Sequence, residues 1–250
     1  NWVKLGKLIP AESGTTYFSI EYVQSLKFDI ANGDNSALKS RRNKSFVSGI
    51  SLYDSYIPGD SVNLEPVRYI LGVVNENKIE VSTDILLSVL ADCAVKLMLS
   101  RLGEKMDSPV LKAFLNNEYA SLPYSFLIDD LIYGVEGIED IADDYPELFE
   151  TEYVYEEAVD VLCLLYISLK SSRDRKFQGC YYTPSKVAKR LCDNLILTDK
   201  MESKKIMDPC CGTGNFILQI PDCFDYKNVY ANDIDSLSVK LSRINYVLRY

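Results

Sequence analysis

The chain has 250 residues, of which 47% are hydrophobic and 25% are charged, enough for one large or two modest globular domains. No apolar run approaches the roughly 18 to 20 residues that cross a bilayer, and the first residues lack the organisation of a signal peptide. There is no histidine, and the seven cysteines show no paired metal-ligand spacing. We therefore expect a cytoplasmic protein with reduced thiols, no membrane segment and no bound metal.

The formal net charge of −9 is unusual for a protein that binds nucleic acid, because such binding relies on lysine and arginine facing phosphates. Residues 129–160 contain many carboxylates and no lysine or arginine. This stretch is interpreted as the solvated face of a helical region, and the alternative is a surface for a basic partner or for docking within the molecule.

Residues 1–80 give few indications beyond a helix start near Glu65, and a clear helical pattern begins only at Ser82. From Ser82 to Met98, apolar residues recur at steps of three and four, which predicts an amphipathic helix capped by Ser82 or Thr83. Further helices are predicted over residues 108–117 and 123–131. A last one, over residues 155–169, is apolar on more than one face and should be buried.

The next segment, Phe177-Gln178-Gly179-Cys180-Tyr181-Tyr182-Thr183-Pro184, leads into another predicted helix. Pro184 suits the first turn of that helix, with Thr183 as its cap. The free N–H groups of a capped helix start suit a carboxylate ligand. An ordinary capped helix with two buried tyrosines is the alternative.

The stretch Asp208-Pro209-Cys210-Cys211-Gly212-Thr213-Gly214-Asn215-Phe216 lies between a short apolar run, residues 205–207, and a predicted helix start. The apolar run predicts a buried strand. Strand, glycine turn and helix form the geometry that lets backbone N–H groups approach a cofactor. The turn lacks the third glycine of a dinucleotide site and the lysine of a phosphate loop. Its acid, Asp208, would repel a pyrophosphate but suits the ammonium and sulfonium cations of S-adenosylmethionine.

A second strand, starting at Val229, is predicted to end in Asn232-Asp233-Ile234-Asp235. An acidic side chain at this point can accept both hydrogen bonds of a ribose diol. The two strand ends together predict a cofactor that contains adenosine.

These three stretches resemble motifs X, I and II of the amino-methylating DNA methyltransferases, in that order. Residues 160–166 resemble the helix before motif X, although Cys163 and Ile167 stand where the family commonly has Gly and Glu. Motif X before motif I resembles the gamma-type group, which mostly makes N6-methyladenine and includes type I modification subunits and type IIG fusions.

The resemblance implies a mixed fold: a mostly α-helical N-terminal domain, residues 1–170, and then the first part of a Rossmann-like, S-adenosylmethionine-dependent methyltransferase domain, residues 171–250. It implies that Asp233 holds the ribose, that Ile234 packs on the cofactor adenine and that Gly212 and Gly214 allow close backbone approach. Asp235 is assigned either to the ligand or to the cap of the next helix. The full set of cofactor-binding residues that the resemblance implies is Tyr181, Tyr182, Thr183, Pro184, Asp208, Gly212, Gly214, Phe216, Asp233 and Ile234.

The family's catalytic loop, Asn or Asp followed by Pro-Pro and an aromatic residue, has no counterpart here, since the chain has no Pro-Pro pair. We therefore expect no catalytic residues in this chain, an incomplete sheet, and no methyl transfer by it alone. Double-stranded DNA would bind through regions beyond Tyr250, and a specificity or restriction subunit is a further implied partner. The alternatives are a non-catalytic cofactor-binding or assembly module, and part of an RNA or protein methyltransferase.

Overall fold

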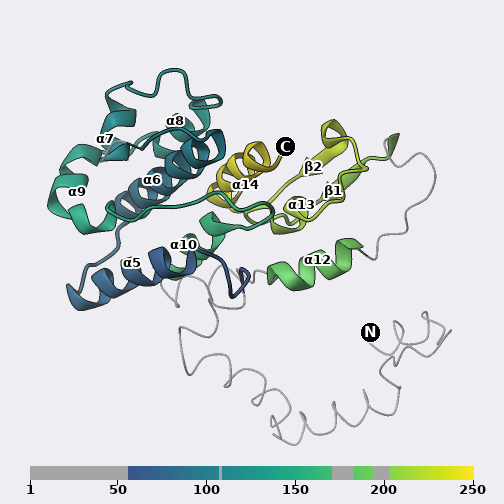
Figure 1. The fold of residues 1–250 in the computed structure, drawn as a ribbon, viewed down its shortest axis with the longest axis horizontal. Helices are drawn as coiled ribbons and strands as arrows, with labels where there is room; N and C mark the ends of the chain where they lie inside the picture. The colour runs from purple at the N-terminus through teal and green to yellow at the C-terminus, as the bar shows by residue number, and fades with distance from the viewer. Residues whose placement is uncertain (1–55, 107–108, 171–182, 194–202) are drawn as a thin grey trace, which may run out of the picture. The chain divides into compact units, whose positions relative to one another are not determined.

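The computed structural model describes residues 56–106, 109–170, 183–193 and 203–250, which all belong to one compact unit (Figure 1). Predictions that concern residues 1–55, Tyr181 or Tyr182 lie outside the described residues. None of the helices in the described ranges is both long enough and apolar enough to cross a membrane.

The described part of the chain is mostly helical. Its first section contains α5 (Leu64–Glu76), α6 (Thr83–Leu102), α7 (Val110–Leu115), α8 (Phe126–Ile132), α9 (Ile138–Asp144), the 3-10 turn η1 (Pro146–Leu148) and α10 (Val161–Leu169). Its second section contains α12 (Ser185–Asp193), β1 (Ile206–Asp208), α13 (Asn215–Leu218), the 3-10 turn η3 (Tyr226–Asn228), β2 (Val229–Ala231) and α14 (Ser236–Arg249).

Helix α6 is the centre of the helical section, and it is buried on all sides rather than amphipathic as predicted. Ser82 caps it as expected, its hydroxyl accepting the Ile85 N–H at 3.2 Å. The polar side of the helix is buried too, because Lys96 forms an ion pair with Asp92 at 2.5 Å and donates to the Phe149 carbonyl at 2.7 Å. Since the two charges satisfy each other, that side can be covered by other helices.

Three predicted helix bounds were wrong in extent. Helices α7 and α8 are shorter than predicted, and α10 begins at Val161 instead of residue 155. Ala158 adopts a left-handed conformation, with φ +59°, which ends any helix before it. The Asp160 carboxylate then accepts the Cys163 N–H at 2.8 Å and so caps the new helix. The prediction that this helix is buried is confirmed.

Helix α12 begins one residue later than predicted. The Pro184 carbonyl accepts the Ala188 N–H at 3.0 Å, so Pro184 is the cap residue and Thr183 lies before it. The Ser185 N–H donates to the Tyr56 carbonyl at 3.1 Å, which ties the start of α12 to the start of the described chain.

Strands β1 and β2 pair in parallel, with Ile206 opposite Val229 and Met207 opposite Tyr230, and they are the sheet strands of the described residues. Ile206 and Val229 pack on a small apolar cluster of Cys211, Ile217, Ile220 and Phe224. On the opposite face Met207 is 65% exposed and Tyr230 is 48% exposed, so the prediction of a buried first strand was wrong for this face. A mostly helical unit with two parallel strands is compatible with a partial methyltransferase domain, and a Rossmann-like sheet stays a prediction.

Helix α14 joins the strand pair to the helical section and lies between them in Figure 1. Its apolar residues Leu241, Ile244 and Leu248 belong to the main core, while Tyr246 and Tyr250 pack on the small cluster beneath the strands. Helix α14 thus packs on both sides of the predicted division at residue 170, and that division stays a prediction.

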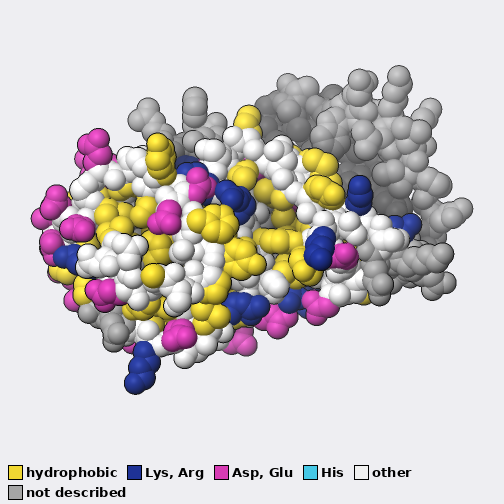
Figure 2. All heavy atoms as spheres, turned by 90° about the horizontal axis from the view of Figure 1, so that it is seen from above, with side chains coloured by type: hydrophobic (Ala, Val, Ile, Leu, Met, Phe, Trp, Pro, Cys, Tyr) yellow, Lys and Arg dark blue, Asp and Glu magenta, His cyan; other side chains and the backbone are white. Residues whose placement is uncertain are grey.

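Acidic side chains are numerous at the end of the molecule where α7 and α9 lie (Figure 2). Some acids of residues 129–160 instead form ion pairs within the unit: Asp130 contacts Arg243 at 3.1 Å and Lys240 at 3.6 Å, and Glu157 contacts Arg249 at 2.9 Å. At these positions the acidic side chains pair with basic residues of α14 while they stay partly exposed to solvent.

Candidate functional site

The turn after β1 is held against the loop after β2 by backbone hydrogen bonds. The Asn232 N–H donates to the Asp208 carbonyl, and the Cys211 N–H donates to the Asn232 carbonyl, both at 2.9 Å. The Asp208 carboxylate also accepts the Cys210 N–H at 3.1 Å, which closes the start of the turn. The carboxyl ends of the two strands therefore lie side by side, as parallel strands require.

Two glycines shape the turn because both adopt backbone conformations that other residues rarely take. Gly212 has φ +53° and Gly214 has φ +97°. A Cβ atom on Gly214 would lie 2.8 Å from Ser242 Oγ, so α14 passes directly behind the turn. Glycine is therefore needed at position 214 for close packing against α14 as well as for its backbone conformation, and close approach to a cofactor stays a prediction.

Asp233 connects the glycine turn to the loop after β2. One carboxylate oxygen accepts the Gly212 N–H at 2.8 Å, and the other accepts the Asp235 N–H at 2.9 Å. The side chain is half-buried. Each carboxylate oxygen has a second lone pair, so both oxygens can still accept a ligand hydroxyl.

Asn215 connects the turn to the start of α12. Its amide group donates to the Thr183 carbonyl at 2.5 Å. Thr183 and Pro184 are both half-buried. The structure therefore brings Thr183, the glycine turn and Asp233 into one contiguous set.

Asp160 is the residue whose importance local sequence reasoning missed. Its carboxylate accepts the Thr213 hydroxyl at 2.5 Å and the Asn245 amide at 2.8 Å, and Asn245 also donates to the Thr213 carbonyl at 2.8 Å. Burial raises the pKa of the Asp160 carboxyl to about 6. No local pattern reveals this cluster, because Thr213 lies 53 residues and Asn245 lies 85 residues away in the chain.

Asp235 caps α14: its carboxylate accepts the Leu237 N–H at 3.2 Å and the Ser238 hydroxyl at 2.7 Å. The Tyr166 hydroxyl donates to the same carboxylate at 2.9 Å. Of the two roles considered for Asp235, the cap is the one that the structure has.

Three of the predicted residues have a polar atom without a hydrogen-bond partner in the described part of the protein, or an apolar surface left at least partly exposed, and could contact a ligand. The second carboxylate oxygen of Asp208 is buried without a hydrogen-bond partner, the Ile234 side chain is 100% exposed, and Phe216 is half-buried. The neighbouring Cys211 is no candidate nucleophile, because burial raises the pKa of its thiol to about 11. Within the described ranges no cluster of Cys, Asp and Glu could hold a metal ion.

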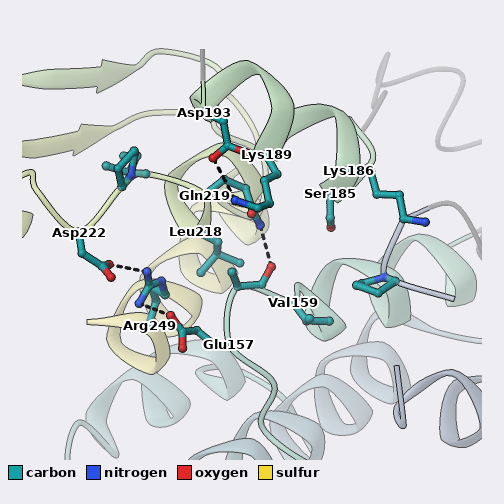
Figure 3. Close-up of a pocket in the computed structure, with 14 residues that line it drawn as sticks. Glu157, Val159, Ser185, Lys186, Lys189, Asp193, Leu218, Gln219, Asp222 and Arg249 are labelled. Atoms are coloured by element: carbon teal, nitrogen blue, oxygen red, sulfur yellow. Dashed lines mark hydrogen bonds and ion pairs between the residues drawn. The ribbon is translucent and has the colours of Figure 1, made fainter. Parts of the chain in front are cut away.

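Two clefts lie beside this set rather than on it. A cleft of about 490 Å³ lies between α12, the end of α13 and the segment before α10, and it is lined by Ser185, Lys186, Lys189 and Arg249 among others (Figure 3). A second one, of about 400 Å³, lies between α8, α14 and β2. The predicted cofactor residues line neither, and Arg249 in the first cleft is already paired with Glu157 and Asp222.

Comparisons with known proteins find similarity in the C-terminal part of the chain. Residues 164–250 match the family model described as N-6 DNA Methylase. The Type II methyltransferase M.VspI from Vibrio sp. (strain 343) is 36% identical over 77 residues, which are 30% of this chain and 18% of that protein. The search of solved structures gave no significant match. These findings support placing residues 164–250 with the N-6 DNA methylases.

Proposed function

We propose that this chain is the cofactor-binding part of an S-adenosylmethionine-dependent DNA methyltransferase that modifies adenine N6. The observation that carries the proposal is the contact between Asp233 and the Gly212 N–H, which places an acidic side chain beside a glycine turn at the ends of two parallel strands. This arrangement suits an adenosine moiety, and the match of residues 164–250 to N-6 DNA methylases favours methyl transfer.

The residues present fit S-adenosylmethionine. Asp233 would accept the ribose hydroxyls through its outward lone pairs, and the exposed Ile234 would cover one face of the adenine. The unpaired oxygen of Asp208 is suited to the ammonium group of the methionine end, and the start of α12 at Thr183 and Pro184 to its carboxylate. Tyr181 and Tyr182 would line the same end, and Phe216 belongs to the same proposed set of cofactor-binding residues.

S-adenosylmethionine supplies an electrophilic methyl group on sulfur, and transfer to an amino group needs a base-holding loop. Since the chain has no Pro-Pro pair to form such a loop, we propose that it does not methylate DNA alone. Double-stranded DNA, the gamma-type arrangement and a restriction-modification context are part of the same proposal. They are supported by the order of the motifs and by a relative whose name is Type II methyltransferase.

The test is calorimetric titration of S-adenosylmethionine into the 250-residue chain, its Asp233→Asn variant and its Ile234→Ala variant. We expect saturable binding that Asp233→Asn weakens by at least about tenfold, the effect of losing one charged hydrogen bond. Ile234→Ala should weaken binding without changing the melting temperature, because the side chain is 100% exposed.

Asp225→Asn is the matched control. Its carboxylate also accepts a backbone N–H, that of Lys227 at 2.9 Å, but it lies before β2 rather than after it. Equal weakening by Asp225→Asn, or tighter binding of NAD than of S-adenosylmethionine, would contradict the proposal.

A further inference from the structure

Helix α10, together with its cap residue, forms hydrogen bonds with both loops of the proposed cofactor site. Near its start, Asp160 accepts hydrogen bonds from Thr213 in the glycine turn and from Asn245 in α14. Further along, Tyr166 donates to Asp235 in the loop after β2. One rigid element therefore touches the two loops whose spacing decides whether a ligand fits between them.

The contacts to the glycine turn are shielded from water. Asp160, Thr213 and Asn245 are 2%, 0% and 3% exposed, and the three side chains form a closed set of hydrogen bonds. Buried hydrogen bonds of this kind fix a single geometry, because a partner that moves away leaves an unpaired polar group without water to replace it.

The contact to the second loop acts through a helix cap. Asp235 caps α14 while its neighbour two residues earlier, Asp233, accepts the Asp235 N–H. A shift of Asp235 must therefore move Asp233, and with it the Gly212 N–H that Asp233 accepts. Tyr166 contacts this series of residues at Asp235, where its hydroxyl donates to the carboxylate.

We propose that α10 is a positioning element for the cofactor site: Asp160 sets the glycine turn, and Tyr166 sets the loop that carries Asp233 and Ile234. This inference rests on the proposed function for the identity of the ligand but not for the geometry of the loops. Asp160 and Tyr166 are 2% and 1% exposed, so their side chains are closed off from a ligand and both are positioning residues.

The test measures amide hydrogen exchange and S-adenosylmethionine affinity in the 250-residue chain with Thr213→Val, Thr213→Ser, Tyr166→Phe and Asp160→Asn. We expect Thr213→Val to speed exchange in residues 210–215 and Tyr166→Phe in residues 233–238, each by about tenfold, the effect of one buried hydrogen bond. Exchange in α5 should stay unchanged. The affinity should fall by a similar factor, and Thr213→Ser, which keeps the hydroxyl, should restore both values.

Asp92→Asn is the matched control, since Asp92 is a buried acid of α6 whose partner, Lys96, lies on the same helix. It should lower the melting temperature without changing exchange in either loop. Unchanged loops and affinity in Thr213→Val and Tyr166→Phe would overturn the inference, as would equal effects of Asp92→Asn. If the variants speed exchange in the loops while the wild-type chain binds no S-adenosylmethionine, that result would support positioning by α10 and refute the proposed function.

Discussion

At the scale of single residues, the turn after β1 depends on close packing as much as on polar contacts. Gly214 combines a left-handed backbone with a position against Ser242, whereas Gly103, at the end of α6, has a similar φ of +70° and open space around it. A substitution at Gly103 therefore introduces backbone strain alone, whereas a substitution at Gly214 introduces backbone strain and a steric clash.

We predict that Gly214→Ala destabilises the protein more than Gly103→Ala does. Both pay about 1 kcal/mol for the left-handed conformation, but only the first pushes a methyl group against Ser242 Oγ. Urea denaturation should show the difference, and Ser242→Ala should reduce the cost of Gly214→Ala. Equal costs for the two glycines would mean that α14 moves away freely.

The second prediction at this scale concerns pH. Burial raises the pKa of Asp160 to about 6, above its ordinary value of 3.8, so the folded protein binds a proton more tightly than the unfolded chain. Proton binding by Asp160 therefore contributes its full share to the free energy of unfolding below about pH 4, and this share is lost as the pH rises through 6. It is on the order of 3 kcal/mol for a shift of this size.

Asp160→Asn should flatten this loss of stability between pH 4 and 6 by about half, as measured by denaturation at a series of pH values. The remaining slope belongs to Asp92, whose pKa burial also raises to about 6. An unchanged slope in Asp160→Asn would show that the carboxyl titrates normally.

At the scale of elements, α6 shows how an ion pair lets a helix be buried on every side. Lys96 and Asp92 are four residues apart and almost without exposed surface, and Lys189 and Asp193 in α12 have the same spacing on the surface. The environment of the pair is thus the main difference between the two.

We predict that Lys96→Met costs about 3 to 5 kcal/mol at pH 7, because it leaves the Asp92 carboxylate buried without its cation. Lys189→Met should cost less than about 1 kcal/mol, as exposed pairs do. Replacing both Asp92 and Lys96 by apolar residues should recover much of the loss. Denaturation of the three variants tests this, and a small cost for Lys96→Met would contradict it.

The elements also show what local patterns can predict. The start of α6 at Ser82, the two strands and the glycine turn follow from caps, alternation and special backbone angles, all of which act over a few residues. The contact of Lys96 with the Phe149 carbonyl and the cluster at Asp160 instead depend on partners from distant parts of the chain that the fold brings close. The residues of the glycine turn and of the loop after β2 could therefore be named from the sequence, and their role toward a ligand stays a prediction. The support that Asp160 gives to the turn from a distant part of the chain could not be named in this way.

At the scale of the whole molecule, the strand pair is covered on one face only. Met207 and Tyr230 lie opposite each other on the exposed face, and a parallel sheet is normally covered on both. Exposed apolar side chains on a sheet favour association.

We predict that the 250-residue chain associates with itself as its concentration rises, and that Met207→Lys together with Tyr230→Lys suppresses this. Sedimentation velocity over a range of concentrations measures both. Tyr133→Lys is the control, because Tyr133 is 86% exposed but lies at the end of α8, away from the strands. Equal suppression by the control would assign the association to another surface.

Helix α14 has a consequence for dividing this protein into pieces. A cut at residue 164, where the family match begins, would separate Asp160 from Thr213 and Asn245 and would strip the helical core from Leu241, Ile244 and Leu248. The portion that carries the matched motifs would then expose three large apolar side chains and lose the buried partner of its glycine turn. The segment that is easiest to recognise by its sequence, residues 164–250, is therefore not expected to fold as an independent domain.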